Sequence, residues 1–157
     1  LISDAGTLKR IDFSLLGNAP AFLATMGSQS VSNNSYTTLA FATEVVDTDS
    51  AYNNSTYTFT VPANQAGLYY FTAMTQAAGV DDGERAQLVF AVDGTRDSKT
   101  MTRGYAPATD TSIYCTSSSI LNLSAGEAVT AVVLQASGDT QDCGYGQFAG
   151  FKLTGTQ

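Results

Sequence analysis

The feature that most constrains the fold is a pair of segments with apolar side chains on both faces. Residues 68–77 and 128–135 both read as extended chain, and in the first of them Tyr69 and Phe71 alternate with Tyr70. Successive side chains of a strand point to opposite faces, so neither face of such a strand can be left in water. We therefore expect a sheet that packs on a second sheet of its own chain and is also covered on its other side.

Strand patterns recur along the rest of the chain, and turn residues such as Asp93-Gly94 separate them. Nowhere do apolar residues recur at helical spacing for three turns, and residues 95–110 read as a long irregular connection. With no helices between the strands, the chain is predicted to be all-β, an antiparallel two-sheet jelly-roll sandwich. The further strand candidates are residues 21–26, 36–42, 56–61, 86–92, 111–123 and 147–154.

Composition limits the partners. The chain has 157 residues, of which 13% are charged, and its net charge is −7. This balance disfavours nucleic acid and anionic membrane as partners, because a negative surface repels both. No run of 18 apolar residues is present, so membrane insertion is not predicted. The break at Gly17-Asn18-Ala19-Pro20 divides the chain into a linker, residues 1–18, and one jelly-roll domain, residues 19–157.

Four short motifs follow one another in a characteristic order. They are Tyr57-x-Phe59-x-Val61-Pro62, Ala66 to Phe71, Leu121 to Val129 and Phe148 to Leu153. In this order they resemble the trimeric jelly-roll domain of the complement C1q globular head and the tumour necrosis factor superfamily, over residues 21–154. The resemblance implies a homotrimer in which two further copies cover the exposed sheet. The candidates for the axis-facing set are Tyr70, Met74, Phe148 and Phe151.

The flanking segments are similar to a more specific variant of that domain. Ala19 to Phe22, Asn33 to Tyr36 and Phe41 to Asp47 look like the form found in tailed-phage fibre and virion-surface proteins. Ile2 to Ile11 looks like the linker that precedes C-terminal domains of tail fibres, although Ala5 stands where glycine is usual. The resemblance implies that residues 1–18 join a shaft, contact other virion proteins and place the domain on the virion surface, at the end of a longer protein.

The chain offers little for catalysis. It has no His, which removes the commonest general base and most transition-metal sites. Asp81, Asp82 and Glu84 lie together, and adjacent carboxylates could cleave a glycosidic bond, hold calcium or simply be solvated. We expect no enzyme activity, no metal site and no cofactor, with calcium as the one open alternative. Cys115 and Cys143 are too few for a zinc site, and they either pair as a disulfide or are two buried thiols.

Strand alternation predicts where the loops lie. If the chain enters the first strand from the linker, then residues 27–35, 48–54, 79–85 and 142–146 fall at the far end of the sandwich. Amide, carboxylate and aromatic side chains in these segments suit a sugar-binding surface, although ordinary polar loops would look the same. The candidate ligand-binding residues are Tyr52, Asn53, Asn54, Asp81, Asp82, Glu84, Asp142 and Tyr145.

Three functions follow as hypotheses. The first is a non-enzymatic structural and recognition module, the trimeric C-terminal head of a phage fibre or capsid-surface protein that binds host or environmental surface glycans. The second is a secreted complement-like or cytokine-like trimer that binds a protein receptor, with glycosylation sequons at Asn33, Asn54 and Asn122. The third is a glycan-cleaving enzyme that uses the carboxylates of residues 81–84.

Overall fold

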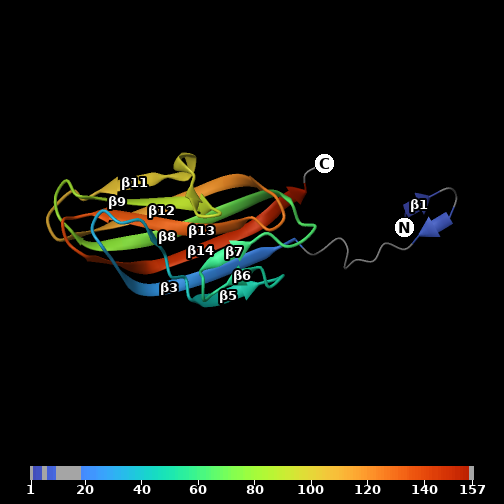
Figure 1. Cartoon of the computed structure of the whole chain (residues 1–157), viewed down its shortest axis with the longest axis horizontal. Coiled ribbons are helices and arrows are strands. Elements are labelled where there is room, and N and C mark those ends of the chain that lie inside the picture. Colours follow the sequence, from blue (N-terminus) through green and yellow to red (C-terminus); the bar gives the residue numbers. More distant parts are fainter. Residues whose placement is uncertain (1, 5–6, 10–18, 156–157) are drawn as a thin grey trace.

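The computed structural model describes residues 2–4, 7–9 and 19–155, and the described chain is almost entirely β-strand (Figure 1). Strands β1 (Ile2–Asp4) and β2 (Thr7–Lys9) form an antiparallel hairpin. The predicted linker over residues 1–18 otherwise lies outside the described residues. Among those that are described, no helix has the length and apolar character to cross a membrane.

The remaining strands form two antiparallel sheets that face each other, as predicted (Figure 1). The five-stranded sheet has the order β12-β8-β14-β3-β5, and its strands are β3 (Ala21–Val31), β5 (Thr43–Asp47), β8 (Gly67–Val80), β12 (Thr111–Leu123) and β14 (Gln141–Gly155). The seven-stranded sheet has the order β10-β9-β13-β7-β6, with β11 paired to β9 and β4 paired to β13. Its strands are β4 (Thr37–Thr38), β6 (Tyr52–Asn53), β7 (Thr58–Thr60), β9 (Arg85–Val92), β10 (Thr95–Arg96), β11 (Thr102–Tyr105) and β13 (Ala128–Ala136).

A stack of aromatic rings fills the space between the sheets. The Phe22 ring lies 4.9 Å from the rings of Tyr52 and Phe59, and it meets Phe148 edge-on at 4.8 Å. Gly150 makes room for this packing, since a Cβ at its position would approach the Phe71 ring to 2.5 Å. Aromatic pairs of this geometry add to the free energy gained from burying their area, so the rings hold the two sheets in register.

One residue predicted to face the trimer axis belongs to this core instead. Phe148 is completely buried between the sheets. The expectation for Phe148 was wrong because Phe148 and Phe151 are three residues apart, and an odd spacing places two residues on opposite faces of a strand. Phe151 is the one that faces outward, beside its cross-strand partner Tyr70, with the ring centroids 5.5 Å apart. Met74 is half-buried on the same side as Tyr70.

The strand predictions failed at short strands, at edge strands and at the far end of two long strands, because β3 continues to Val31 and β14 already begins at Gln141. The segment 95–110, expected to be irregular, contains β10, a 3-10 turn η2 (Ser98–Thr100) and β11. Strands β5 and β6 were not expected at all. Every residue of β5 before Asp47 is exposed, so the strand has no buried face and its sequence no alternation.

The two cysteines do not pair. Cys115 lies opposite Thr75 on one side of β8, and Cys143 lies opposite Ala77 on the other side. Two strand spacings amount to about 9.5 Å, which exceeds the roughly 7 Å that a disulfide can bridge between Cα atoms. Both thiols are free and buried. Burial raises the pKa of both, that of Cys143 to about 12, and the nearby Cys115 and Asp142 contribute to the latter shift.

Both thiols should therefore be inert in the native protein. We expect no alkylation by iodoacetamide at pH 8 under native conditions, because the reactive thiolate is not populated. Intact mass spectrometry should find two modifications per chain only when the reagent is added in guanidinium chloride without a reducing agent. Denatured, unreduced protein that takes up no label would contradict this result and indicate a disulfide.

Candidate functional site

The eight residues predicted to form one ligand surface are divided among separate places. The reason is β5, which runs back along β3 and brings Asp47 opposite Phe22, near the start of β3. Residues 48–54 therefore leave from the entry end of the sandwich, where β3 begins, and not from the far end. Asn53 and Asn54 lie on the flank of the seven-stranded sheet, away from the β8–β9 turn at the far end (Figure 1).

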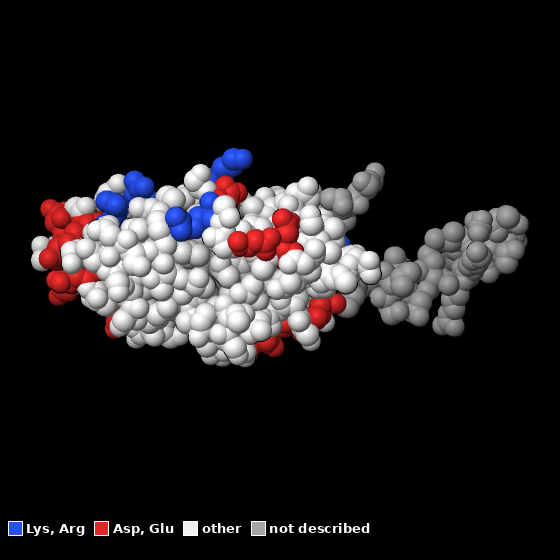
Figure 2. Space-filling model, in the orientation of Figure 1, with Lys and Arg blue, Asp and Glu red and all other residues white. Residues whose placement is uncertain are grey.

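The far end carries a concentration of carboxylates (Figure 2). Two of them accept hydrogen bonds from backbone amides: the Asp81 carboxylate from the Asp110 amide of the connection between β11 and β12, at 2.9 Å, and the Glu84 carboxylate from the Asp81 amide of its own turn, at 2.7 Å. Asp82 is exposed at the same turn. Within the described parts of the chain, no group of three or more His, Cys, Asp or Glu residues could hold a metal ion. Nothing in this turn therefore supports the calcium alternative.

Asp142 and Tyr145 belong to β14 and not to a loop. The Asp142 carboxylate accepts a hydrogen bond of 2.9 Å from the Ser30 hydroxyl on the adjacent strand. Tyr145 has a φ of 49° and sits where the register of β14 against β8 shifts. Such a bulge redirects a side chain, and 75% of Tyr145 is exposed. Because β14 is the central strand of its sheet, the ring projects from the face that points away from the core.

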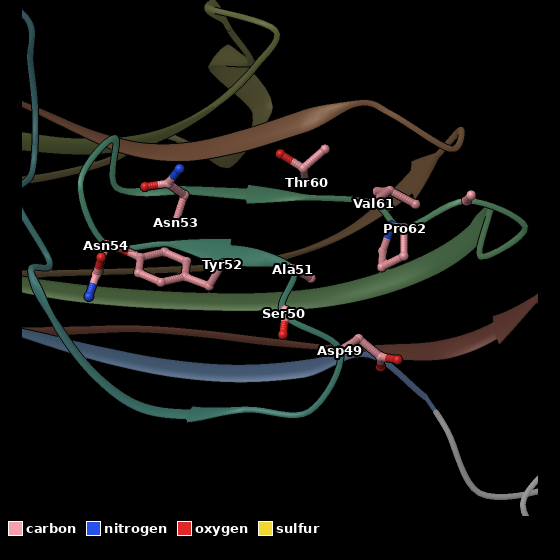
Figure 3. Close-up of a pocket in the computed structure, with 10 residues that line it drawn as sticks. Asp49, Ser50, Ala51, Tyr52, Asn53, Asn54, Thr60, Val61 and Pro62 are labelled. Atoms are coloured by element: carbon pink, nitrogen blue, oxygen red, sulfur yellow. The ribbon is translucent and has the colours of Figure 1, made fainter.

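The flank of the seven-stranded sheet holds an open pocket of about 640 Å³ (Figure 3). It lies between the segment that enters β6 and the segment that leaves β7. Its lining combines amide, hydroxyl and carboxylate groups with a small apolar wall. The lining residues are Asp49, Ser50, Ala51, Tyr52, Asn53, Asn54, Thr60, Val61, Pro62 and Ala63.

The pocket is shaped by a carboxylate that sequence reasoning did not single out. The half-buried Asp47 accepts hydrogen bonds from the amides of Tyr52 at 2.8 Å, Ala51 at 3.1 Å and Asp49 at 3.3 Å. Asn53 then closes the next turn by accepting a hydrogen bond of 2.9 Å from the Ser55 amide. The run Asp47-Thr48-Asp49-Ser50 could have indicated this role in the sequence. Asp side chains commonly accept hydrogen bonds from backbone amides a few residues later in the chain.

Tyr52, predicted to contact ligand, lines the pocket but is mostly buried. Only 6% of the residue is exposed, its ring stacks on Phe22, and its hydroxyl donates a hydrogen bond of 2.9 Å to the Phe41 carbonyl. Burial, followed by the nearby Tyr57 and Glu44, raises its pKa. Burial and then Asp49 raise the pKa of Tyr69 to about 12. The stability that these two phenols contribute is thus present at neutral pH and is lost as the pH rises above about 10.

The five-stranded sheet presents apolar side chains on the side away from the core. Tyr70 lies between two cross-strand partners, Ile120 on β12 and Phe151 on β14. Ile120 is 58% exposed and Phe151 is 45% exposed. Alternation along β8 places Leu68 and Met74 on the same side as Tyr70. We call this set of residues (Leu68, Tyr70, Met74, Ile120 and Phe151) the outward apolar face.

Ile120 was not among the residues predicted for that face. Its serine-rich surroundings in the sequence, Ser117-Ser118-Ser119, gave no apolar alternation from which its orientation could be read. Only the pairing of β12 with β8 places its side chain beside Tyr70.

Comparisons with known proteins agree with this architecture. A family model described as the C1q domain matches residues 21–153. The globular domain of the zebrafish complement 1qA protein is 18% identical, with a TM-score of 0.62, and the match covers 87% of this chain and 99% of that one. Eiger TNF from S. frugiperda is 14% identical, with a TM-score of 0.63 and coverage of 88% and 95%. The PRD1 vertex protein P5 is 14% identical, with a TM-score of 0.61 and coverage of 87% and 96%. At these identities the likeness concerns the fold.

No curated protein matches the chain.

The role of Asp47 leads to a prediction about the pocket. Replacing Asp47 by Ala leaves three amides without their acceptor, so the free energy of unfolding should fall by about 1–3 kcal/mol. Hydrogen exchange at the Ala51 and Tyr52 amides should accelerate more than exchange in β8. Asp82→Ala, at an exposed carboxylate, should change the stability by less than about 0.5 kcal/mol. Equal effects of the two substitutions would show that Asp47 does not organise the pocket.

Proposed function

Because this chain belongs to the C1q domain family, we propose that it is a non-enzymatic recognition domain that works as a homotrimer. The observation that carries the proposal is the outward apolar face. Tyr70, Ile120 and Phe151 adjoin one another across three neighbouring strands, and in a single chain they face water. Contiguous exposed apolar surface of this kind marks an association site.

The family suggests that two further copies of the chain cover the outward apolar face. Domains of the C1q and tumour necrosis factor type generally form trimers. One edge of the five-stranded sheet also carries apolar side chains that such packing would cover. The edge strand β5 exposes Val45 and Val46, which are apolar and uncovered within one chain. In the proposed trimer, an edge of one copy packs against the outward apolar face of the next, so that apolar surface of both kinds leaves water.

We place this trimer at the C-terminal end of a phage fibre or of another virion-surface protein. The support is the likeness of residues 2–11 and 19–22 to tail-fibre sequences, together with a fold neighbour that is a vertex protein. Domains of this type are typically extracellular or on virions. In this proposal residues 1–18 connect the head to a shaft and contact other virion proteins.

The pocket on the flank is the site that we propose for glycan. Asn54, Ser50 and Thr60 are exposed there and offer amide and hydroxyl groups, while Pro62 supplies an apolar wall. Such a mixture suits the hydroxyls and the apolar face of a neutral sugar ring. The chain has no His, and the Asp81 and Glu84 carboxylates bond to backbone amides, which supports recognition without cleavage.

The alternative is a secreted trimer that binds a protein receptor. Its support is that Asn54 and Asn122, both within sequons, are exposed, whereas Asn33 is half-buried and accepts a hydrogen bond from the Gly138 amide. Surface plasmon resonance with purified polysaccharide separates the virion head from the secreted trimer. The virion proposal requires that the chain bind the polysaccharide in the absence of any protein receptor.

The trimer is tested by light scattering. The 157-residue chain should elute at three times its mass at micromolar concentration. The double variant Tyr70→Glu/Phe151→Glu should be monomeric, because two charges per copy cannot be buried without partners. Tyr105→Glu is the control, since Tyr105 is an exposed aromatic residue on the other sheet, and this variant should remain trimeric. A monomeric wild type would overturn the proposal.

The glycan site is tested on an array of bacterial surface polysaccharides. Asn54→Ala should weaken binding by roughly twofold to tenfold, the effect of losing one hydrogen bond. Asn122→Ala removes another exposed amide, on β12 opposite Leu68 of the outward apolar face, and it should leave binding unchanged provided that light scattering shows the variant to be trimeric. Analysis of the bound glycan after incubation should find it intact. Cleavage products, or an equal loss of binding in both variants, would contradict the assignment.

A further inference from the structure

The basic side chains of this acidic protein are gathered on one sheet. Five Lys or Arg residues follow residue 18, and four of them are Arg85, Arg96, Lys99 and Arg103. These four come from β9, β10, η2 and β11, which are consecutive in the chain. Figure 2 shows Lys and Arg side chains along the side of the sandwich formed by β9 and β11, with the crowded carboxylates of the far end beginning next to them.

The strand register arranges the three arginines in a row. The residues of β9 that face the core include Ala86, Leu88 and Phe90, so Arg85 and every second residue after it face outward. Arg103 lies opposite Gln87, and Arg96 lies opposite Ala91. The row follows β9 from residue 85 to residue 91, which corresponds to about 20 Å of strand. We call it the arginine row.

Aromatic rings accompany the arginine row. The Arg96 guanidinium lies 3.8 Å from the centre of the Tyr36 ring. Tyr36 and Met101 pack on a small apolar cluster on the outer face of the seven-stranded sheet. The cluster consists of Val89, Ala91 and Val132. Beside this cluster is an open pocket of about 400 Å³, lined by Tyr36, Gly94, Thr95, Arg96, Ser98 and Met101.

A second ring lies near the other end of the row. Arg103 donates a hydrogen bond of 3.4 Å to the hydroxyl of the exposed Tyr105, and Tyr105 is also the cross-strand partner of Arg85. Each end of the arginine row therefore has an arginine in contact with a tyrosine side chain.

The described residues provide no salt-bridge partner for the basic side chains of this surface. In the described part of the structure, none of the four basic side chains takes part in a salt bridge, and the buried Nε of Arg85 has no hydrogen-bond acceptor. The nearby carboxylates have other partners. Asp97 accepts a hydrogen bond from the Lys99 amide, Asp93 accepts one from the Ala128 amide, and Glu84 binds the amide of its own turn.

We propose that the arginine row binds an acidic polysaccharide, a linear glycan that carries carboxylates such as those of uronic acids. Arg is suited to bidentate pairing with carboxylate, and the exposed Tyr105 offers a surface for a sugar ring. A nucleic acid is disfavoured because its phosphates are spaced at about 1.7 Å of duplex axis, so a chain of net charge −7 repels it more strongly than a glycan with at most one carboxylate per sugar. The inference rests on the proposed recognition function but uses a different surface from the pocket that contains Asn54.

The test is isothermal titration calorimetry of the whole 157-residue chain with an oligogalacturonate of defined length. A neutral malto-oligosaccharide of equal length and an inorganic polyphosphate are the comparison probes. The double variant Arg96→Gln/Arg103→Gln removes two charges from the row. Lys152→Gln removes one charge elsewhere, where Lys152 binds the Gln65 side chain at 2.7 Å. Circular dichroism and light scattering of each variant report its fold and its oligomeric state.

The oligogalacturonate should bind, the malto-oligosaccharide should not bind at the row, and affinity should fall as salt is raised. The double variant should lose at least about tenfold in affinity, whereas Lys152→Gln and Asn54→Ala should keep the wild-type affinity. The proposal is overturned if Lys152→Gln weakens binding as much as the double variant does, if the double variant is unaffected, or if polyphosphate binds more tightly than oligogalacturonate. A monomeric chain that still binds oligogalacturonate would refute the trimer and leave the arginine row standing.

Discussion

The structure depends on one limit: packing two sheets against each other buries only the side of each sheet that faces the other. Strand β8 reaches this limit, because Tyr69 and Phe71 fill the core while Tyr70 and Met74 point to the opposite side. The aromatic rings around Phe22 pack between the two inner faces. The outer face of the five-stranded sheet is therefore exposed in a single chain, and the proposed trimer would cover it.

The central parts of the long strands could be predicted from their apolar and β-branched residues, but β3 continues to Val31 beyond the predicted 21–26, and β14 begins at Gln141 before the predicted 147–154. Strand β12 begins and ends at the predicted residues 111 and 123, and β13 differs by one residue. Strands β5, β6 and β10 could not be predicted, because an exposed or two-residue strand buries no regular face. Such strands are determined by backbone pairing with distant partners.

The surface was less predictable for the same reason. The eight expected ligand residues were grouped by assuming that successive connections between the predicted strands alternate between the two ends of the sandwich. The unpredicted strand β5 adds one more reversal, so residues 48–54 lie at the entry end. Net charge suggested a uniformly acidic protein, yet register aligns Arg85, Arg103 and Arg96 along β9. The clustering of basic residues between positions 85 and 103 was visible in the sequence, but without strand pairing it did not indicate a common face.

The outward apolar face is the centre of this account, and its solvent accessibility in solution can be measured side chain by side chain. In hydroxyl-radical footprinting of the native chain at micromolar concentration, Tyr70 and Phe151 should be protected while Tyr105 is oxidised readily. On dilution towards dissociation, the protection of Tyr70 and Phe151 should disappear together. Phe151 oxidised as fast as Tyr105 at every concentration would contradict the account, because the face would then be open to water.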